Sequence, residues 1–171
     1  MYVYDVNGDG LNDVVTSLHG HGFGLAWFEQ KRSASGEITF VRHMIIDDFT
    51  TRNTGNIITT EMHGSAIADV DGDGVPDFIT GKRFWSHLDS YTDPDPEGAP
   101  VLYVYHTVRD KKAPGGARFV PELISNQSGI GAQFVARDLK GDGAVDIVTS
   151  GALGTYIFWG KPIPGHTKSH R

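Results

Sequence analysis

The chain has 171 residues, which suits a single domain, and its 22 glycines predict many tight turns and few long helices. It contains no cysteine, which excludes disulfide bonds and thiolate zinc sites. The formal net charge of −6 does not favour nucleic-acid binding, and no apolar run is long enough to predict membrane insertion.

An acidic segment opens the chain and recurs twice. Residues 5–15 read DVNGDGLNDVV, residues 69–79 read DVDGDGVPDFI, and residues 138–148 read DLKGDGAVDIV. Similar segments at nearly even spacing indicate a repeat architecture. We call residues 5–13, 69–77 and 138–146 loops one, two and three, and we number the positions in each loop from 1 to 9.

Strands are predicted on both sides of each loop. An apolar, β-branched run follows each loop, at residues 14–17, 78–81 and 147–150. Strands before the loops are predicted at 2–4, 65–68 and 133–136, third strands at 24–28, 101–105 and 155–159, and fourth strands at 39–45 and 118–124. The aromatic residues of the third strands are expected to pack between units: Trp27, Phe28, Tyr103, Tyr105, Phe158 and Trp159.

Four antiparallel strands with a loop between the first two form the blade of a β-propeller. The predicted fold class is therefore all-β, a segment of about two and a half to three four-stranded antiparallel blades. The predicted units are residues 1–56, residues 57–128, and a partial third blade at residues 129–160. Residues 161–171 contain two prolines and a glycine and predict a tail without regular structure.

The loops place oxygen donors at alternate positions, as a calcium ion requires. The predicted ligands are Asp5, Asn7, Asp9, the carbonyl of Leu11 and Asp13 in loop one, and Asp69, Asp71, Asp73, the carbonyl of Val75 and Asp77 in loop two. An EF-hand would need a glutamate at position 12 and flanking helices, whereas position 12 is a threonine in all three repeats. We expect a structural role for the ion, because the loops carry neither a nucleophile nor a histidine.

Loop three departs from this pattern at position 3. Lys140 stands there, and an ammonium has no lone pair to offer a metal. We expect Lys140 to lie among Asp138, Asp142 and Asp146 as an internal cation, so that these three residues form a weak or degenerate calcium site.

These loops and their flanking strands resemble the FG-GAP/VCBS repeats of integrin α-subunit heads and of many secreted bacterial proteins. The resemblance covers residues 1 to about 160. It implies a calcium-stapled propeller of about seven blades. Closing such a ring would require further blades of a longer chain or a second copy. The resemblance also implies an extracellular, periplasmic or cell-surface location, although residues 1–5 contain no export signal.

A second group of candidate residues falls at the strand ends opposite the loops, where a propeller can bind ligands. Its members are His19, His21, His63, Lys82, Arg83, Trp85, His87 and Gln133. Histidines and aromatics there suit a hydroxylated ligand, a transition metal or acid–base chemistry, but they are also common as scattered surface residues.

Three functions follow from these observations. The leading one is a calcium-binding module for protein or carbohydrate ligands, including cell adhesion. The alternatives are a carbohydrate-active lyase similar to the aldos-2-ulose dehydratases, with its site on the histidine-rich face, and a purely structural repeat array.

Overall fold

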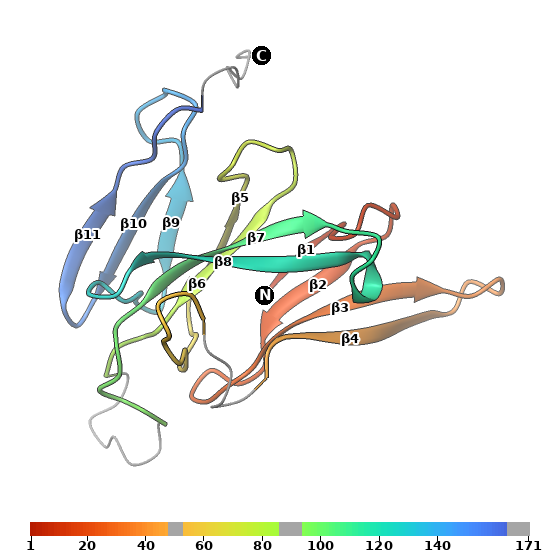
Figure 1. The fold of residues 1–171 in the computed structure, drawn as a ribbon, viewed down its shortest axis with the longest axis horizontal. Coiled ribbons are helices and arrows are strands. Elements are labelled where there is room, and N and C mark those ends of the chain that lie inside the picture. Colours follow the sequence, from red (N-terminus) through yellow and green to blue (C-terminus); the bar gives the residue numbers. More distant parts are fainter. Residues whose placement is uncertain (48–52, 86–93, 164–171) are drawn as a thin grey trace.

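The protein, seen in a computed structural model that describes residues 1–47, 53–85 and 94–163, consists of antiparallel β-sheets. Two sheets have four strands and one has three, and they follow one another along the chain (Figure 1). Such a succession of small antiparallel sheets is a partial propeller, and the predicted all-β fold class is confirmed.

In each sheet, strands that are neighbours in sequence are also neighbours in space. The first sheet contains β1 (Tyr2–Tyr4), β2 (Asp13–Ser17), β3 (Leu25–Arg32) and β4 (Ile38–Ile46). The second contains β5 (Ser65–Ala68), β6 (Asp77–Gly81), β7 (Leu102–Arg109) and β8 (Ala117–Ser125). The third contains β9 (Phe134–Arg137), β10 (Asp146–Gly151) and β11 (Gly154–Phe158).

Every predicted strand is present, but β3 and β7 extend beyond their predicted ends to Arg32 and Arg109. They are longer because they pair with β4 and β8 along their whole length. A single 3-10 turn at Pro114–Gly116 lies between β7 and β8 among the described residues. No helix in the described part of the chain has the length and apolar character needed to cross a bilayer.

The middle sheet has two apolar faces because it packs against a sheet on each side. On β6, Phe78 belongs to the core shared with the first sheet, whereas the next residue, Ile79, belongs to the core shared with the third. Tyr103 and Leu102 on β7 divide in the same way. Successive strand residues point to opposite faces of a sheet. A strand that is covered on both faces therefore needs apolar residues at successive positions.

Most aromatic residues of the third strands pack between the sheets, as expected. Trp27, Tyr103 and Tyr105 are almost completely buried. Trp159 is an exception, since 56% of its surface is exposed, and the expectation that it packs between blades was wrong. It lies just after β11, and its ring instead faces the ammonium of Lys140.

Candidate metal-binding loops

The three loops connect the first and second strands of their sheets and are closed by the same pairing. Position 9 of each loop is the first residue of the second strand. It pairs with the last residue of the first strand: Asp13 with Tyr4, Asp77 with Ala68, and Asp146 with Arg137.

The position 9 aspartates are buried hydrogen-bond acceptors. Asp13, Asp77 and Asp146 have relative exposures of 0%, 1% and 0%. In each, one carboxylate oxygen accepts the backbone N–H of position 2, at 3.0, 2.9 and 3.0 Å. The other oxygen accepts a backbone N–H from the third strand or its end: Gln30 at 2.8 Å, Thr107 at 3.0 Å and Gly160 at 2.9 Å. Position 9 therefore ties each loop to the third strand, whether or not it also touches a metal.

The position 1 aspartate shapes the turn that follows it. In loop one, Asp5 accepts the backbone N–H groups of Gly8, Asp9 and Gly10 at 2.7, 3.1 and 3.1 Å. Gly8 and Gly10 have φ angles of 83° and 84°, which a side chain would disfavour. Asp138 accepts the corresponding three bonds in loop three, at 2.7, 3.2 and 2.8 Å.

Loop two gathers three of its predicted ligands into one group. Asp69, Asp71 and Asp73 each have a carboxylate oxygen within 4.8 Å of the others. Asp69 accepts one bond, from Gly74 N–H at 3.2 Å, and its other oxygen is buried without a hydrogen-bond partner. Burial raises the pKa of Asp71, and the charges of Asp77 and Asp73 raise it further. Three crowded carboxylates with an unsatisfied oxygen fit a divalent cation.

The other predicted ligands of loop two are Asp77 and the carbonyl of Val75. Asp77 does not join the group of three but forms a second one with Asp71 and His106, again with ligand atoms within 4.8 Å of one another. Val75, predicted to offer its carbonyl, donates its N–H to Asp73 at 2.7 Å, and Leu11 does the same to Asp9 in loop one, at 2.8 Å.

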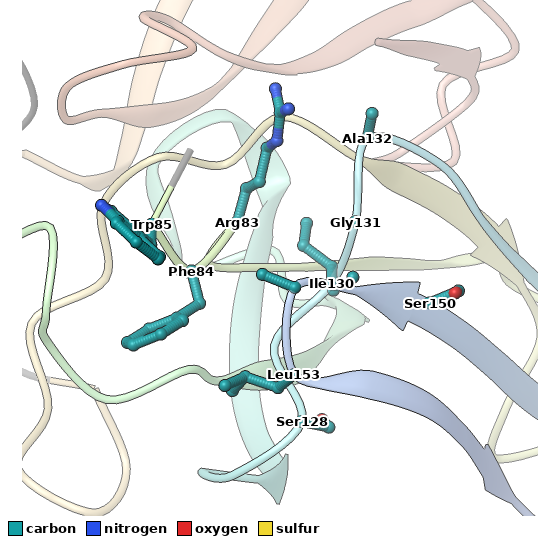
Figure 2. A pocket seen from close by; sticks show the side chains of 11 residues that line it. Arg83, Phe84, Trp85, Ser128, Ile130, Gly131, Ala132, Ser150 and Leu153 are labelled. Carbon is teal, nitrogen blue, oxygen red and sulfur yellow. The ribbon is translucent and has the colours of Figure 1, made fainter. Parts of the chain in front are cut away.

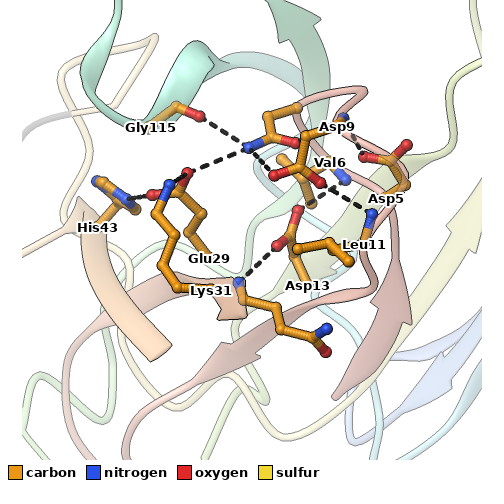
Figure 3. Close-up of polar contacts among 11 residues, drawn as sticks. Asp5, Val6, Asp9, Leu11, Asp13, Glu29, Lys31, His43 and Gly115 are labelled. Atoms are coloured by element: carbon orange, nitrogen blue, oxygen red, sulfur yellow. Dashed lines mark hydrogen bonds and ion pairs between the residues drawn. The ribbon is translucent and has the colours of Figure 1, made fainter. Parts of the chain in front are cut away.

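In loop one, the position 3 amide lies in a wider polar network, of which Figure 3 labels Asp9, Glu29 and Gly115. Asn7 Nδ2 donates to Asp9 at 3.3 Å, to Glu29 at 3.3 Å and to the carbonyl of Gly115 at 3.0 Å. Glu29, a β3 residue, also contacts Lys31 and lies 3.0 Å from His43 Nε2. Burial raises the pKa of Asp13, and the charges of Asp9 and Asp5 add to this effect.

In loop three, the ammonium of Lys140 lies beside the carboxylates, as expected. Its Nζ is 2.8 Å from Asp142 Oδ2 and 3.6 Å from Asp146 Oδ1. It also donates to the carbonyl of Gly160 at 2.9 Å, and it lies 5.5 Å from the centre of the Trp159 ring. Lys140 lowers the pKa of Asp142, whereas the pKa values of Asp71 and Asp13 in the other loops are raised.

Sequence reasoning missed the residues that face position 3 from the third strand or from just after it. They are Glu29, His106 and Trp159. Each directly precedes the residue that donates its N–H to the position 9 aspartate. His106 Nδ1 is 3.6 Å from Asp71 and 3.3 Å from Asp77, and its Nε2 is 2.7 Å from Glu122. Contact with Asp77 and then with Glu122 raises the pKa of His106 to about 9. Glu29, His106 and Trp159 occupy equivalent positions in the three sheets but differ in chemical type. Only the register between the strands could have identified them, and the sequence does not give that register.

The strand-end candidates do not form one cluster. The rings of His21 and His63 meet edge to face, with centroids 4.5 Å apart, and His19 Nδ1 accepts the N–H of His21 at 3.2 Å. Gln133 is exposed, and His87 lies outside the described residues. Lys82 is fully buried, and its Nζ lies 2.7 Å from Thr60 Oγ1 and 3.3 Å from Glu61 Oε1.

Arg83 and Trp85 line a pocket of about 170 Å³ between the second and third sheets, together with Ile130, Ser150 and Leu153 (Figure 2). Pockets for drug-sized ligands usually exceed about 300 Å³, so this pocket would admit one small group rather than a whole sugar.

The comparisons with known proteins bear on these loops. The sequence model of the FG-GAP-like repeat matches residues 5–80, which run from loop one through loop two and β6. The searches of curated proteins and of solved structures gave no significant match. Residues 5–80 are therefore similar to an FG-GAP-like repeat.

Proposed function

We propose that this protein is a calcium-binding repeat module, in which loops one and two each hold a structural Ca²⁺ and the sheets present a surface for a protein or carbohydrate ligand. The observation that carries the proposal is the ammonium of Lys140 beside the carboxylates of loop three. Loops one and two have an oxygen-bearing side chain at the same position, Asn7 or Asp71. An ammonium thus stands at position 3 of loop three, where the other two loops carry an oxygen that can bind Ca²⁺.

The donors in loop two support this assignment. Asp69, Asp71 and Asp73 bring three carboxylates together, and a buried oxygen of Asp69 lacks a hydrogen-bond partner. Calcium accepts six to eight oxygen ligands and tolerates irregular geometry. In loop one, the carboxylates of Asp5, Asp9 and Asp13 and the amide oxygen of Asn7 offer the same class of donor.

A structural role fits the position of the loops. Each connects two strands of one sheet, and its position 9 side chain reaches the third strand. An ion bound there would relieve repulsion among the carboxylates and hold the first hairpin of the sheet together. Extracellular modules bind calcium with dissociation constants of about 10⁻⁴ to 10⁻³ M, which suits the extracellular, periplasmic or cell-surface location that we propose.

Thermal unfolding in Ca²⁺ and in EGTA tests the proposal. A ligand that binds only the folded state at a hundred times its dissociation constant stabilises it by about 2.7 kcal/mol per site. We expect Ca²⁺ to raise the melting temperature, and Asp73→Ala to lose about half of this increase by disabling one of two sites.

Asp142→Ala is the matched control, because Asp142 occupies the same position of loop three. It should keep the full response to calcium. Equal melting temperatures in Ca²⁺ and in EGTA for the unmodified protein would overturn the proposal.

A further inference from the structure

We propose that Asp71, Asp77 and His106 form a second cation position next to loop two, suited to a divalent transition metal such as Zn²⁺, with Glu122 orienting the histidine. The position shares Asp71 with the proposed calcium site but uses a different set of donors. It goes beyond the proposed calcium function and can hold or fail independently of it.

The distances around His106 Nδ1 are close to those between two ligands of one metal ion. Nδ1 lies 3.3 Å from Asp77 Oδ2 and 3.6 Å from Asp71 Oδ2. Hydrogen bonds from nitrogen to oxygen usually span about 2.7–3.2 Å. Two ligands bound tetrahedrally to one zinc ion, at about 2.0–2.1 Å each, lie about 3.4 Å apart. The observed separations are close to this value.

The nitrogen that faces the carboxylates makes ion pairs with them but no hydrogen bond. His106 Nδ1 is buried and lacks a hydrogen-bond partner, and Asp77 is 1% exposed. The other ring nitrogen, Nε2, lies 2.7 Å from Glu122 Oε2. With its proton on Nε2, facing Glu122, the ring would offer the Nδ1 lone pair to a cation, which would replace the ion pairs that Nδ1 makes with Asp71 and Asp77.

The pairing of His106 with Glu122 is the arrangement that metal-binding histidines commonly have. Such a histidine usually donates its second N–H to a carboxylate, which fixes the tautomer and increases the basicity of the ligand. Calcium prefers oxygen donors, whereas an imidazole favours zinc and its neighbours in the first transition series. The histidine therefore separates this position from the all-oxygen group of loop two.

The first sheet provides an internal comparison. Glu29 on β3 pairs with Val41 on β4, and His106 on β7 pairs with Val120 on β8. His43 and Glu122 lie two residues further along β4 and β8, so the two sheets hold a histidine and a glutamate in exchanged places. In the first sheet, Glu29 therefore lies between the loop and His43, and its carboxylate accepts a hydrogen bond from Asn7 of loop one.

Zinc binding measured by equilibrium dialysis in excess Ca²⁺ tests the proposal. We expect His106→Gln to lose one bound equivalent of Zn²⁺. Glu122→Gln should weaken the binding of that equivalent about 10- to 100-fold. His43→Gln, which replaces the corresponding histidine of the first sheet, should bind as much Zn²⁺ as the unmodified protein does. Circular dichroism of each variant verifies folding, and Glu122→Gln decides the question if His106→Gln does not fold.

Two further measurements separate this proposal from the calcium one. Asp73→Ala should lose calcium but keep the zinc equivalent, because Asp73 belongs only to the oxygen group. His106→Gln should keep the stabilisation by Ca²⁺. Zinc binding that is the same with and without His106 would overturn the proposal, since the zinc would then lie at other histidines. Failure of the unmodified protein to bind Zn²⁺ would overturn it as well.

Discussion

Position 3 carries a different chemical group in each loop. Asn7, Asp71 and Lys140 occupy the same place in three otherwise similar turns. Each meets a different residue on the third strand or just after it: Glu29, His106 or Trp159. An amide, a carboxylate and an ammonium require different neighbours, so a change at position 3 accompanies a change about 20 to 35 residues further along the chain. Loop and strand therefore form one unit in each sheet.

Position 9 has a role that does not depend on metal. Asp146 accepts the N–H groups of Leu139 and Gly160, as Asp77 does for Val70 and Thr107. Removing a buried acceptor leaves its donors unsatisfied, at a cost of about 1–3 kcal/mol each. We expect Asp146→Ala to lower the free energy of unfolding by about 2–6 kcal/mol, measured by urea denaturation.

Calcium should not reverse this loss, since loop three carries its own ammonium. Asp142→Ala, in the same loop but exposed, should cost much less. Equal losses in the two variants, or rescue of Asp146→Ala by Ca²⁺, would contradict the hydrogen-bond role of position 9.

At the scale of the elements, contacts between neighbouring sheets connect the loop of one sheet to the third strand of the next. Tyr4, the last residue of β1, makes a buried hydroxyl–hydroxyl bond of 3.0 Å with Thr107 on β7. Arg109, at the end of β7, donates to the carbonyl of Asp5 at 2.9 Å and lies 3.7 Å from the Asp5 carboxylate. Loop one is therefore held by the second sheet as well as by its own.

The Tyr4 hydroxyl offers a direct measure of this coupling. A typical hydrogen bond contributes about 1 kcal/mol, so Tyr4→Phe should lower the free energy of unfolding by about that amount or slightly more, because Thr107 loses a buried partner. Tyr156→Phe is the control, since its exposed hydroxyl bonds to Leu153 within a single hairpin. Equal stability of Tyr4→Phe and the unmodified protein in urea would argue against a contribution from this contact.

The strands could be predicted from sequence because the acidic loops repeat and the runs after them are β-branched. Residues such as Glu29 and His106 could not, because their role depends on which strand residue lies opposite position 3. Trp159 shows the same limit: its aromatic character indicated a core position, but the lysine of loop three holds it near the surface. The burial of Lys82 also depends on partners distant in sequence, Thr60 and Glu61.

At the scale of the whole molecule, the two outer sheets differ from the middle one. Among the residues that the structure describes, the exposed large hydrophobic side chains on strands all belong to the outer sheets, at Val3, Ile38, Phe40, Val41, Met44, Val135 and Ile157. The middle sheet is covered by a neighbour on each side. An open arc of sheets gives this distribution, and the outer faces fit the further blades or second copy that the sequence leads us to expect.

The molecule as a whole should bind two calcium ions, because two loops offer oxygen at position 3 and one carries an ammonium. Lys140→Asp gives loop three the same aspartates at positions 1, 3, 5 and 9 that loop two has. Calorimetric titration with Ca²⁺ should therefore give two ions for the unmodified protein and three for Lys140→Asp. Absence of calcium binding, or the same number of ions in both proteins, would contradict the assignment of the loops as cation sites governed by position 3.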